Sequence, residues 1–199
     1  MSPTPLVLLL AAGQGVATPA EPALSWEQAR SLAQKIEQLE ERERGKPKAG
    51  AAAPPAVVVT EGELNSYLNL SLASKMPVGL ADVKVQLDRD HIAARAMVDI
   101  EKVAARSVDA GRWNPLSYLT GRVPLEVKGR YRHAQEGFGS LEVEEVRLAT
   151  LPVPLSLIEQ MVSSASRTGA KPVDIQAPFR LPYAAKRLRV QKGQARLEF

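Results

Sequence analysis

Side chains that commonly carry catalysis are scarce in this chain. Cysteine is absent, which excludes disulfide bonds, thiolate zinc sites and a cysteine nucleophile. The two histidines, His91 and His133, each stand at the end of a predicted strand beside charged residues. A Ser-His-Asp triad needs three side chains brought together by the fold, and the sequence contains no strained nucleophile turn such as Gly-x-Ser-x-Gly. We therefore interpret both histidines as exposed hairpin residues, and expect no catalytic residues and no enzyme activity.

Metal and phosphate sites are also disfavoured. Carboxylates that could bind a hard metal ion gather around the first predicted hairpin, at Asp82, Asp88, Asp90 and Asp99. The segment Asp88-Arg89-Asp90 is common turn chemistry, however, and the alternating ligands and glycine of a calcium loop are missing. The glycines of Gly13-Gln14-Gly15 and Gly137-Phe138-Gly139 are not followed by a helix that could hold a phosphate. We expect no metal and no cofactor.

The C-terminal part of the chain is locally basic. From residue 167 onward, Lys and Arg strongly outnumber the two acidic residues, Asp174 and Glu198. Four of these basic residues are candidates for contact with anionic lipid headgroups: Arg180, Lys186, Arg187 and Arg189. The alternative is a solvated strand face whose charge keeps the edge of a sheet from aggregating.

Two predicted helices carry stripes of large apolar residues that could line a ligand site. The candidate lining residues are Leu64, Tyr67, Leu68, Leu72 and Met76 in one helix and Leu155, Ile158, Met161 and Val162 in the other. If a bent sheet curls around these helices, an acyl chain could lie between them. The alternative is an ordinary filled core, because any amphipathic helix shows such stripes.

Composition limits the domain organisation and the partners. At 199 residues with 45% hydrophobic residues, the chain is long enough for one ordinary domain with a real core. Lys and Arg number 26 against 22 acidic residues, a net charge of +4. This is far from the concentrated positive stripe of nucleic-acid-binding domains, so a nucleic-acid partner is disfavoured.

The N-terminal segment is typical of a signal peptide. An apolar run over residues 5–12 is followed by Gly15 and Ala17, which are small residues at the positions that a signal peptidase reads. The run is too short to cross a bilayer, which takes about 20 apolar residues. No Lys or Arg precedes it, which leaves open a start further upstream. We expect residues 1–17 to be removed and the mature chain to be exported, periplasmic or extracellular; the alternative is an N-terminal tail on a cytoplasmic protein.

The mature chain divides into three regions. Residues 18–44 contain an amphipathic helix that begins at Ser25, which we interpret as an N-cap with Gln28 three residues on. Residues 45–56 are rich in Pro, Gly, Ala and Lys and read as a flexible linker. The helix could pack on the domain, dimerise or bind a partner. Residues 57–199 form the predicted domain.

Helical and strand patterns alternate along the domain. The predicted elements are a strand at 57–59, a helix from a capping box at Thr60 and Glu63 to residue 76, a hairpin over 83–100, a short helical turn ending at 119, a hairpin over 123–148, a helix from 155 to about 167, and a hairpin over 188–199. The apolar phase shifts at Glu144-Glu145, which predicts a bulge that bends the sheet. We expect an α+β fold with a curved antiparallel sheet of hairpins, packed against two amphipathic helices, and a separate N-terminal helix.

The segment Thr60–Leu68, with the sequence TEGELNSYL, resembles the opening helix of certain exported bacterial proteins of uncharacterised type. The resemblance continues through Met76–Leu80, Leu151–Leu155 and Pro178–Tyr183, and covers roughly residues 57 to 199. Some such families are similar to half of a tubular lipid-binding (BPI-like) module, in which a long curved sheet wraps a helix around an apolar channel. This similarity implies lipid handling in the cell envelope and carries over no catalytic residue.

Two functions from different classes follow from these patterns. The leading expectation is a non-enzymatic cell-envelope protein that binds lipid or another apolar ligand, or a membrane surface. The alternative is a structural or adaptor protein of the envelope that recruits a protein partner through its N-terminal helix. A cavity between the sheet and the helices would distinguish them.

Overall fold

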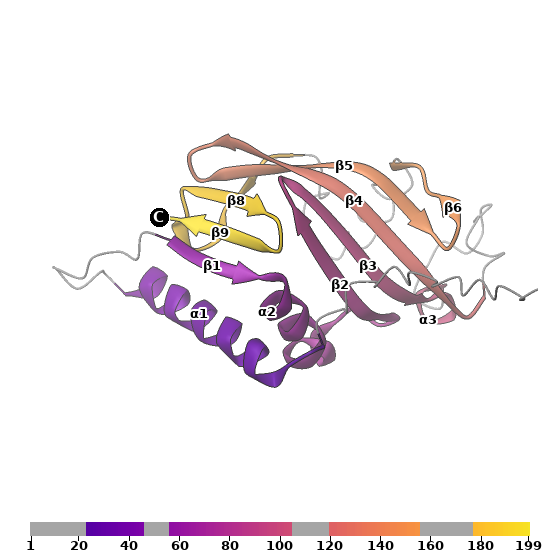
Figure 1. Ribbon diagram of the computed structural model, residues 1–199. Coiled ribbons are helices and arrows are strands. Elements are labelled where there is room, and N and C mark those ends of the chain that lie inside the picture. Colours follow the sequence, from indigo (N-terminus) through magenta and orange to yellow (C-terminus); the bar gives the residue numbers. More distant parts are fainter. Residues whose placement is uncertain (1–22, 46–55, 105–119, 156–176) are drawn as a thin grey trace, which may run out of the picture.

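In the computed structural model, two antiparallel sheets lie next to each other, and a long helix lies alongside the smaller one (Figure 1). The structure describes residues 23–45, 56–104, 120–155 and 177–199. The α+β class predicted from the sequence is confirmed. No helix in these four ranges is long and apolar enough to span a membrane.

The smaller sheet joins the two ends of the domain. Its strand order is β1-β9-β8, with β1 at Ala56–Thr60, β8 at Arg187–Gln191 and β9 at Gln194–Glu198. The hairpin of β8 and β9 was predicted from its alternation and from the turn at Lys192-Gly193, where Gly193 has a φ of 76°. The pairing of β1 with β9 is long-range, and no local pattern predicts it.

The larger sheet has the order β2-β3-β4-β5-β6. Its strands are β2 (Leu80–Asp88), β3 (His91–Asp99), β4 (Arg122–Gln135), β5 (Phe138–Leu148) and β6 (Leu151–Pro152), and β7 (Phe179–Arg180) pairs with β5. The short helix α3 (Ile100–Ala104) follows β3. The hairpins that were predicted to form one sheet thus belong to two sheets, because the β8–β9 hairpin pairs with β1 rather than with its neighbours in sequence.

Turn and bulge chemistry in the larger sheet agrees with the predictions. Arg89 and Asp90 both have positive φ, 24° and 67°, as the two-residue turn between β2 and β3 requires. Lys128 pairs with Glu145 and the next residue, Gly129, pairs with Val143, so Glu144 is the extra residue of a bulge. The bulge keeps Leu141, Val143, Val146 and Leu148 on the inner face, as predicted.

A helical region follows β1, and its turns become wider in the middle. Helix α2 (Glu61–Ser66) begins with the predicted capping box: Thr60 Oγ1 accepts from Glu63 N–H, and the Glu63 carboxylate accepts from Thr60 N–H. It continues as the π-helical turn η1 (Tyr67–Ser71) and the 3₁₀ turn η2 (Ala73–Lys75). The helical region ends before Pro77, as expected.

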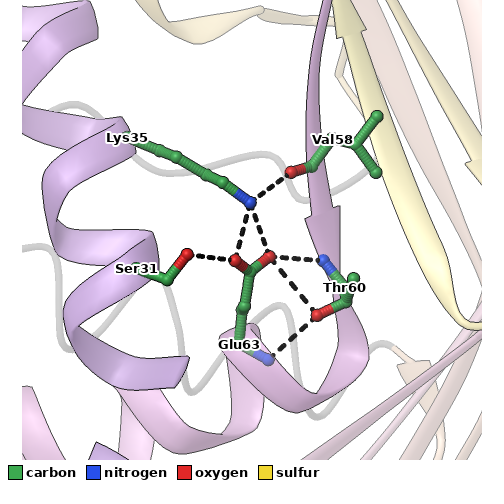
Figure 2. A network of polar contacts seen from close by, with 5 residues as sticks. All are labelled: Ser31, Lys35, Val58, Thr60 and Glu63. Carbon is green, nitrogen blue, oxygen red and sulfur yellow. Dashed lines mark hydrogen bonds and ion pairs between the residues drawn. The ribbon is translucent and has the colours of Figure 1, made fainter. Parts of the chain in front are cut away.

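Helix α1 (Trp26–Arg44) is anchored to the domain by a polar network (Figure 2). Lys35 Nζ donates to both carboxylate oxygens of Glu63, at 2.6 and 2.8 Å, and to the main-chain oxygen of Val58 at 2.7 Å. Ser31 Oγ donates to Glu63 at 2.6 Å. One lysine therefore ties α1 to both β1 and α2. Of the three roles left open for this helix, the structure shows packing on the domain.

Apolar contacts and a second hydrogen bond complete the docking of α1. Ala29, Leu32 and Leu39 are buried on its inner side. Ser25 is the N-cap, but its side chain makes no capping bond; instead its N–H donates to Ser66 Oγ at 3.1 Å, and Ser66 Oγ donates to Gln28. The N-cap position predicted at Ser25 is confirmed, but Ser66 from another helix forms the hydrogen bonds that a capping box of Ser25 and Gln28 would use.

The polar side of α2 and η1 binds the free edge of β2. Glu61 accepts from Leu87 N–H at 2.5 Å, while the Asn65 amide bonds both the N–H and the C=O of Val85, at 2.7 and 2.9 Å. Asn69 donates to the Val83 main-chain oxygen. These side chains, four residues apart, replace the next strand of the sheet. The helix thus covers an edge that would otherwise be open to pairing.

The apolar core is divided between the two ends of the larger sheet. One cluster contains the buried residues Leu87, Tyr131 and Val190. The other contains Ile100, Val123 and Leu148. Between them, apolar residues on the inner face such as Ala94 and Val127 are only half-buried.

Candidate binding groove

A groove with a basic lining lies where the two sheets meet, between β4 and β8. Its volume is about 720 Å³. It is lined by Asp90, Arg130, Tyr131, Arg132, His133, Arg187, Leu188, Arg189, Val190 and Gln191. Four arginines and a histidine face a single carboxylate, so the lining is strongly biased toward positive charge.

The groove exists because β4 is longer than its neighbour. Strand β3 pairs with β4 only as far as Arg130, whereas β4 continues to Gln135. The β4–β5 hairpin therefore extends beyond the β2–β3 hairpin toward β8 (Figure 1). Strand β8 is the outer strand of its own sheet, so one edge of it faces this overhang.

Strand alternation separates the lining into two classes. Tyr131, Leu188 and Val190 pack together in one core cluster and form the apolar side of the groove. Because successive strand residues point to opposite faces, the neighbouring arginines point the other way. Arg130 and Arg132 of β4 and Arg187 and Arg189 of β8 thus form the outer, charged side.

Three of the four arginines have anionic neighbours, all near the surface. Arg132 pairs with Glu142 at 2.7 Å, Arg189 with Glu198 at 3.0 Å and Arg130 with Glu144 at 3.5 Å. Exposed pairs of this kind contribute only about 0–1 kcal/mol each, so a ligand anion could draw these guanidiniums away at little cost. Within the described residues Arg187 forms no ion pair.

Arg130 also contacts a histidine. Its guanidinium lies 3.0 Å from His91 Nε2, and His91 Nδ1 lies 3.1 Å from the Arg89 main-chain oxygen. The imidazole therefore accepts from Arg130 and donates to Arg89, and it is held in one orientation. The other histidine, His133, is exposed and lines the groove.

Tyr131 contributes an unusual buried hydroxyl. The residue is 4% exposed, and its hydroxyl has no hydrogen-bond partner within the part of the chain that the structure describes. Burial raises the pKa of Tyr131, against the opposing effect of the nearby Leu188 main chain, whose approach falls short of a hydrogen bond. A buried polar atom without a protein partner is rare in native proteins, so this hydroxyl is available for a hydrogen bond with a bound ligand.

Two of the four predicted headgroup residues line this groove. Arg187 and Arg189 do so, whereas Lys186 lines a neighbouring hollow of about 300 Å³ with His133 and Phe199. Arg180 lies on β7 and lines neither. The sequence analysis did not identify Arg130 and Arg132 as candidates, because the charged alternation on β4 is visible in the sequence but its proximity to β8 is not.

The apolar residues that were predicted to line a ligand site do not line either of these hollows. Leu64, Tyr67, Leu68, Leu72, Met76 and Leu155 are half-buried, and the hollows described above are lined by other residues. Ile158, Met161 and Val162 lie outside the described residues. The most buried residues of α2 are instead polar, namely Glu63, Asn65 and Ser66. They are buried because they form hydrogen bonds to α1 and to the edge of β2. The acyl-chain cavity stays a prediction.

Carboxylates and histidines in the described ranges form no group of three or more that could hold a metal ion. Two of the acidic residues near the first hairpin have a local structural role. Asp90 is in the turn, and Asp99 accepts from Lys102 N–H at 3.2 Å.

Comparison with protein families, curated proteins and solved structures finds no match to this chain. The resemblance to exported proteins and to a tubular lipid-binding module therefore stays a prediction.

Proposed function

We propose that this chain is a non-enzymatic binding protein of the cell envelope, and that the groove between β4 and β8 is its site for an anionic partner. The observation that carries the proposal is the convergence of four arginines from two strands that are about 55 residues apart in sequence, around a hollow of about 720 Å³. Guanidinium groups bind carboxylate and phosphate through paired hydrogen bonds, so both are suitable ligand groups.

The arrangement favours binding over catalysis. Of the two histidines, His91 is held between Arg130 and Arg89, and His133 is exposed on the rim. A general base needs a substrate proton within reach and an orienting partner, and His133 has no orienting partner among the described residues. The site instead offers charge, an apolar floor and a buried hydroxyl, which suit recognition of a ligand.

The test is binding of two anionic probes to the mature protein. We expect vesicles that contain phosphatidylglycerol, a polyglutamate peptide, or both to bind, and vesicles of phosphatidylcholine not to bind. The double variant Arg130→Gln/Arg187→Gln should lose most of this binding. The double variant Arg180→Gln/Lys192→Gln, which removes the same charge outside the groove, should retain it. Equal losses in both variants, or no binding of either probe, would contradict the proposal.

A second candidate function is lipid binding on the inner face of the larger sheet. It is supported by the division of the core into two clusters with half-buried apolar residues between them. Each buried methylene of an acyl chain would contribute about 0.8 kcal/mol. Native mass spectrometry after exposure to bacterial phospholipid tests this candidate. A bound lipid that Ala94→Trp displaces without lowering the melting temperature supports it, and absence of bound lipid contradicts it.

A further inference from the structure

Asp90 forms main-chain hydrogen bonds to both strands that border the groove. Its N–H donates to the Val190 oxygen on β8 at 3.1 Å, and its C=O accepts from Tyr131 N–H on β4 at 2.6 Å. A single residue of the β2–β3 turn thus bonds to both strands that border the groove. The chain then turns away into β3, so this bridge is not continued along the groove.

Beyond Asp90, each of the two strand edges directs toward the groove main-chain groups that have no main-chain partner among the described residues. In an antiparallel ladder alternate residues direct their N–H and C=O to the same side, so Leu188 shares the side of Val190 and His133 shares the side of Tyr131. Within the described residues, neither Leu188 nor His133 makes a main-chain hydrogen bond outside its own hairpin. The Tyr131 hydroxyl lies beside the Leu188 main chain and likewise has no hydrogen-bond partner in the described part of the chain.

The groove is closed at its far end. Gly137 N–H donates to the Lys186 oxygen at 2.8 Å, which joins the tip of the β4–β5 hairpin to the start of β8. The open stretch therefore lies between Lys186 and Val190, whose main-chain oxygens already accept hydrogen bonds, and comprises residues 187–189. At about 3.4 Å per residue, it accommodates about three extended residues of a bound segment.

We propose that this groove binds an extended acidic segment of a partner protein, which adds as a strand at the edge of β8 and presents carboxylates at alternate positions to the four arginines. This inference rests on the proposed function, an anionic partner in the groove, and specifies what that partner is. Unpaired strand edges bind extended peptides through their main chain, while the flanking side chains select the sequence.

The spacing of the arginines determines which side chains the segment needs. On each edge the two arginines are two residues apart, which is about 7 Å along a strand. An extended chain repeats its own side chains on one face at the same interval. Carboxylates at alternate positions would therefore face the arginines, and the intervening side chains would face Tyr131, Leu188 and Val190, which favours apolar residues there. A single lipid headgroup carries its anionic group at one position only, so it would not reproduce the repeated spacing of the arginines.

The experiment compares labelled hexapeptides by fluorescence anisotropy with the mature protein. The first alternates Glu and Val, the second has the same composition as Glu-Glu-Glu-Val-Val-Val, and two further peptides are the alternating sequence N-methylated at every Val or at every Glu. We expect the alternating peptide to bind about tenfold or more tightly than the block peptide and than at least one N-methylated form, because edge pairing uses the N–H groups of every second residue. Amide hydrogen exchange at Leu188 and His133 should slow when it binds.

Variants and vesicles separate the possible outcomes. Arg130→Gln/Arg187→Gln should abolish peptide binding, and Arg180→Gln/Lys192→Gln should not. Equal affinity for all four peptides, or unchanged exchange at Leu188, would overturn strand addition while leaving an anion-binding groove. Binding of phosphatidylglycerol vesicles alone would assign the groove to lipid headgroups and also overturn it. If no anionic probe binds, the proposed function fails together with this inference.

Discussion

At the scale of single residues, the Glu63 carboxylate forms more hydrogen bonds than any other side chain in the described part of the chain. It completes the capping box of α2, accepts from Ser31 on α1 and pairs with Lys35 (Figure 2). Burial by itself raises the pKa of Glu63, but the hydrogen bonds from Lys35, Ser31 and Thr60 outweigh this effect, so the pKa lies below the ordinary value of 4.5. The carboxylate is thus stabilised in its charged form.

We expect Lys35→Met to destabilise the protein by about 1–3 kcal/mol, because it leaves a largely buried carboxylate without its cation. Urea unfolding at pH 7 measures this change. Arg30→Met, on the exposed side of the same helix, is the matched control and should change the free energy of unfolding by less than about 0.5 kcal/mol. Equal effects of the two substitutions would contradict a specific role for the pair.

The lowered pKa of Glu63 predicts a pH dependence. A carboxyl group whose pKa is lower in the folded state contributes stability that is fully present above its unfolded pKa and is lost as pH falls through the folded pKa. The wild-type free energy of unfolding should therefore decrease as pH falls below about 4.5. Glu63→Gln should weaken this decrease. Parallel pH profiles for the two proteins, measured by urea unfolding between pH 7 and 3, would disagree with this interpretation.

The buried hydroxyl of Tyr131 gives an opposite expectation. Its removal in Tyr131→Phe deletes a polar atom that has no partner among the described residues, so stability should stay the same or rise by up to about 1 kcal/mol. Tyr131→Leu should instead be destabilising, because the ring packs against Gly139, where an added Cβ would lie 2.5 Å from it. Thermal and urea unfolding check both variants. A clear loss of stability in Tyr131→Phe would mean that the hydroxyl is satisfied in the folded protein.

At the scale of elements, the helical region from Glu61 to Ser71 acts as a substitute strand. An α-helix has 3.6 residues per turn, so side chains four residues apart drift around its surface, whereas the edge of β2 is nearly straight. The wider turn of η1 reverses part of this drift. Asn69 consequently stays in line with Asn65 and reaches Val83.

We expect Asn65→Ala to destabilise the protein by about 1–3 kcal/mol, because it leaves the N–H and C=O of Val85 without partners. Amide hydrogen exchange of Val85 should become faster than in the wild type. Ser71→Ala, at an exposed position of the same helical region, provides the comparison and should have little effect on either quantity. Unchanged protection of Val85 in Asn65→Ala would show that the edge is covered in another way.

At the scale of the whole molecule, α1 belongs to the folded unit. It buries Ala29, Leu32 and Leu39 and bonds through Lys35 and Ser31 to elements that follow it in the chain. The adaptor role predicted for this helix stays a prediction, and a partner of the docked helix would meet its outer face, where Trp26 is exposed. The groove proposed as the site for an anionic partner lies between the two sheets and needs no element to detach.

Cleavage between α1 and β1 tests this integration. With a specific protease site introduced within residues 46–55, we expect the cleaved helix to elute together with the remainder of the protein in size exclusion. Ala29→Asp places a charge at a position that is 0% exposed and should release the helix after the same cleavage. Release of the helix from the otherwise unsubstituted protein would return α1 to the role of a detachable partner-binding element.

The sequence by itself determined the features that depend on neighbouring residues. Alternation and turn residues predicted the hairpins, the phase shift at Glu144 predicted the bulge, and Thr60 with Glu63 predicted a capping box, because each is specified within a few residues. The tertiary structure alone decided that β1 pairs with β9 and that Asn65 and Ser66 are buried. It also decided that Arg130 and Arg132 face Arg187 and Arg189 across a groove. Local periodicity indicates which face of a strand is exposed to solvent, but only the packing of distant segments decides which exposed faces lie next to each other.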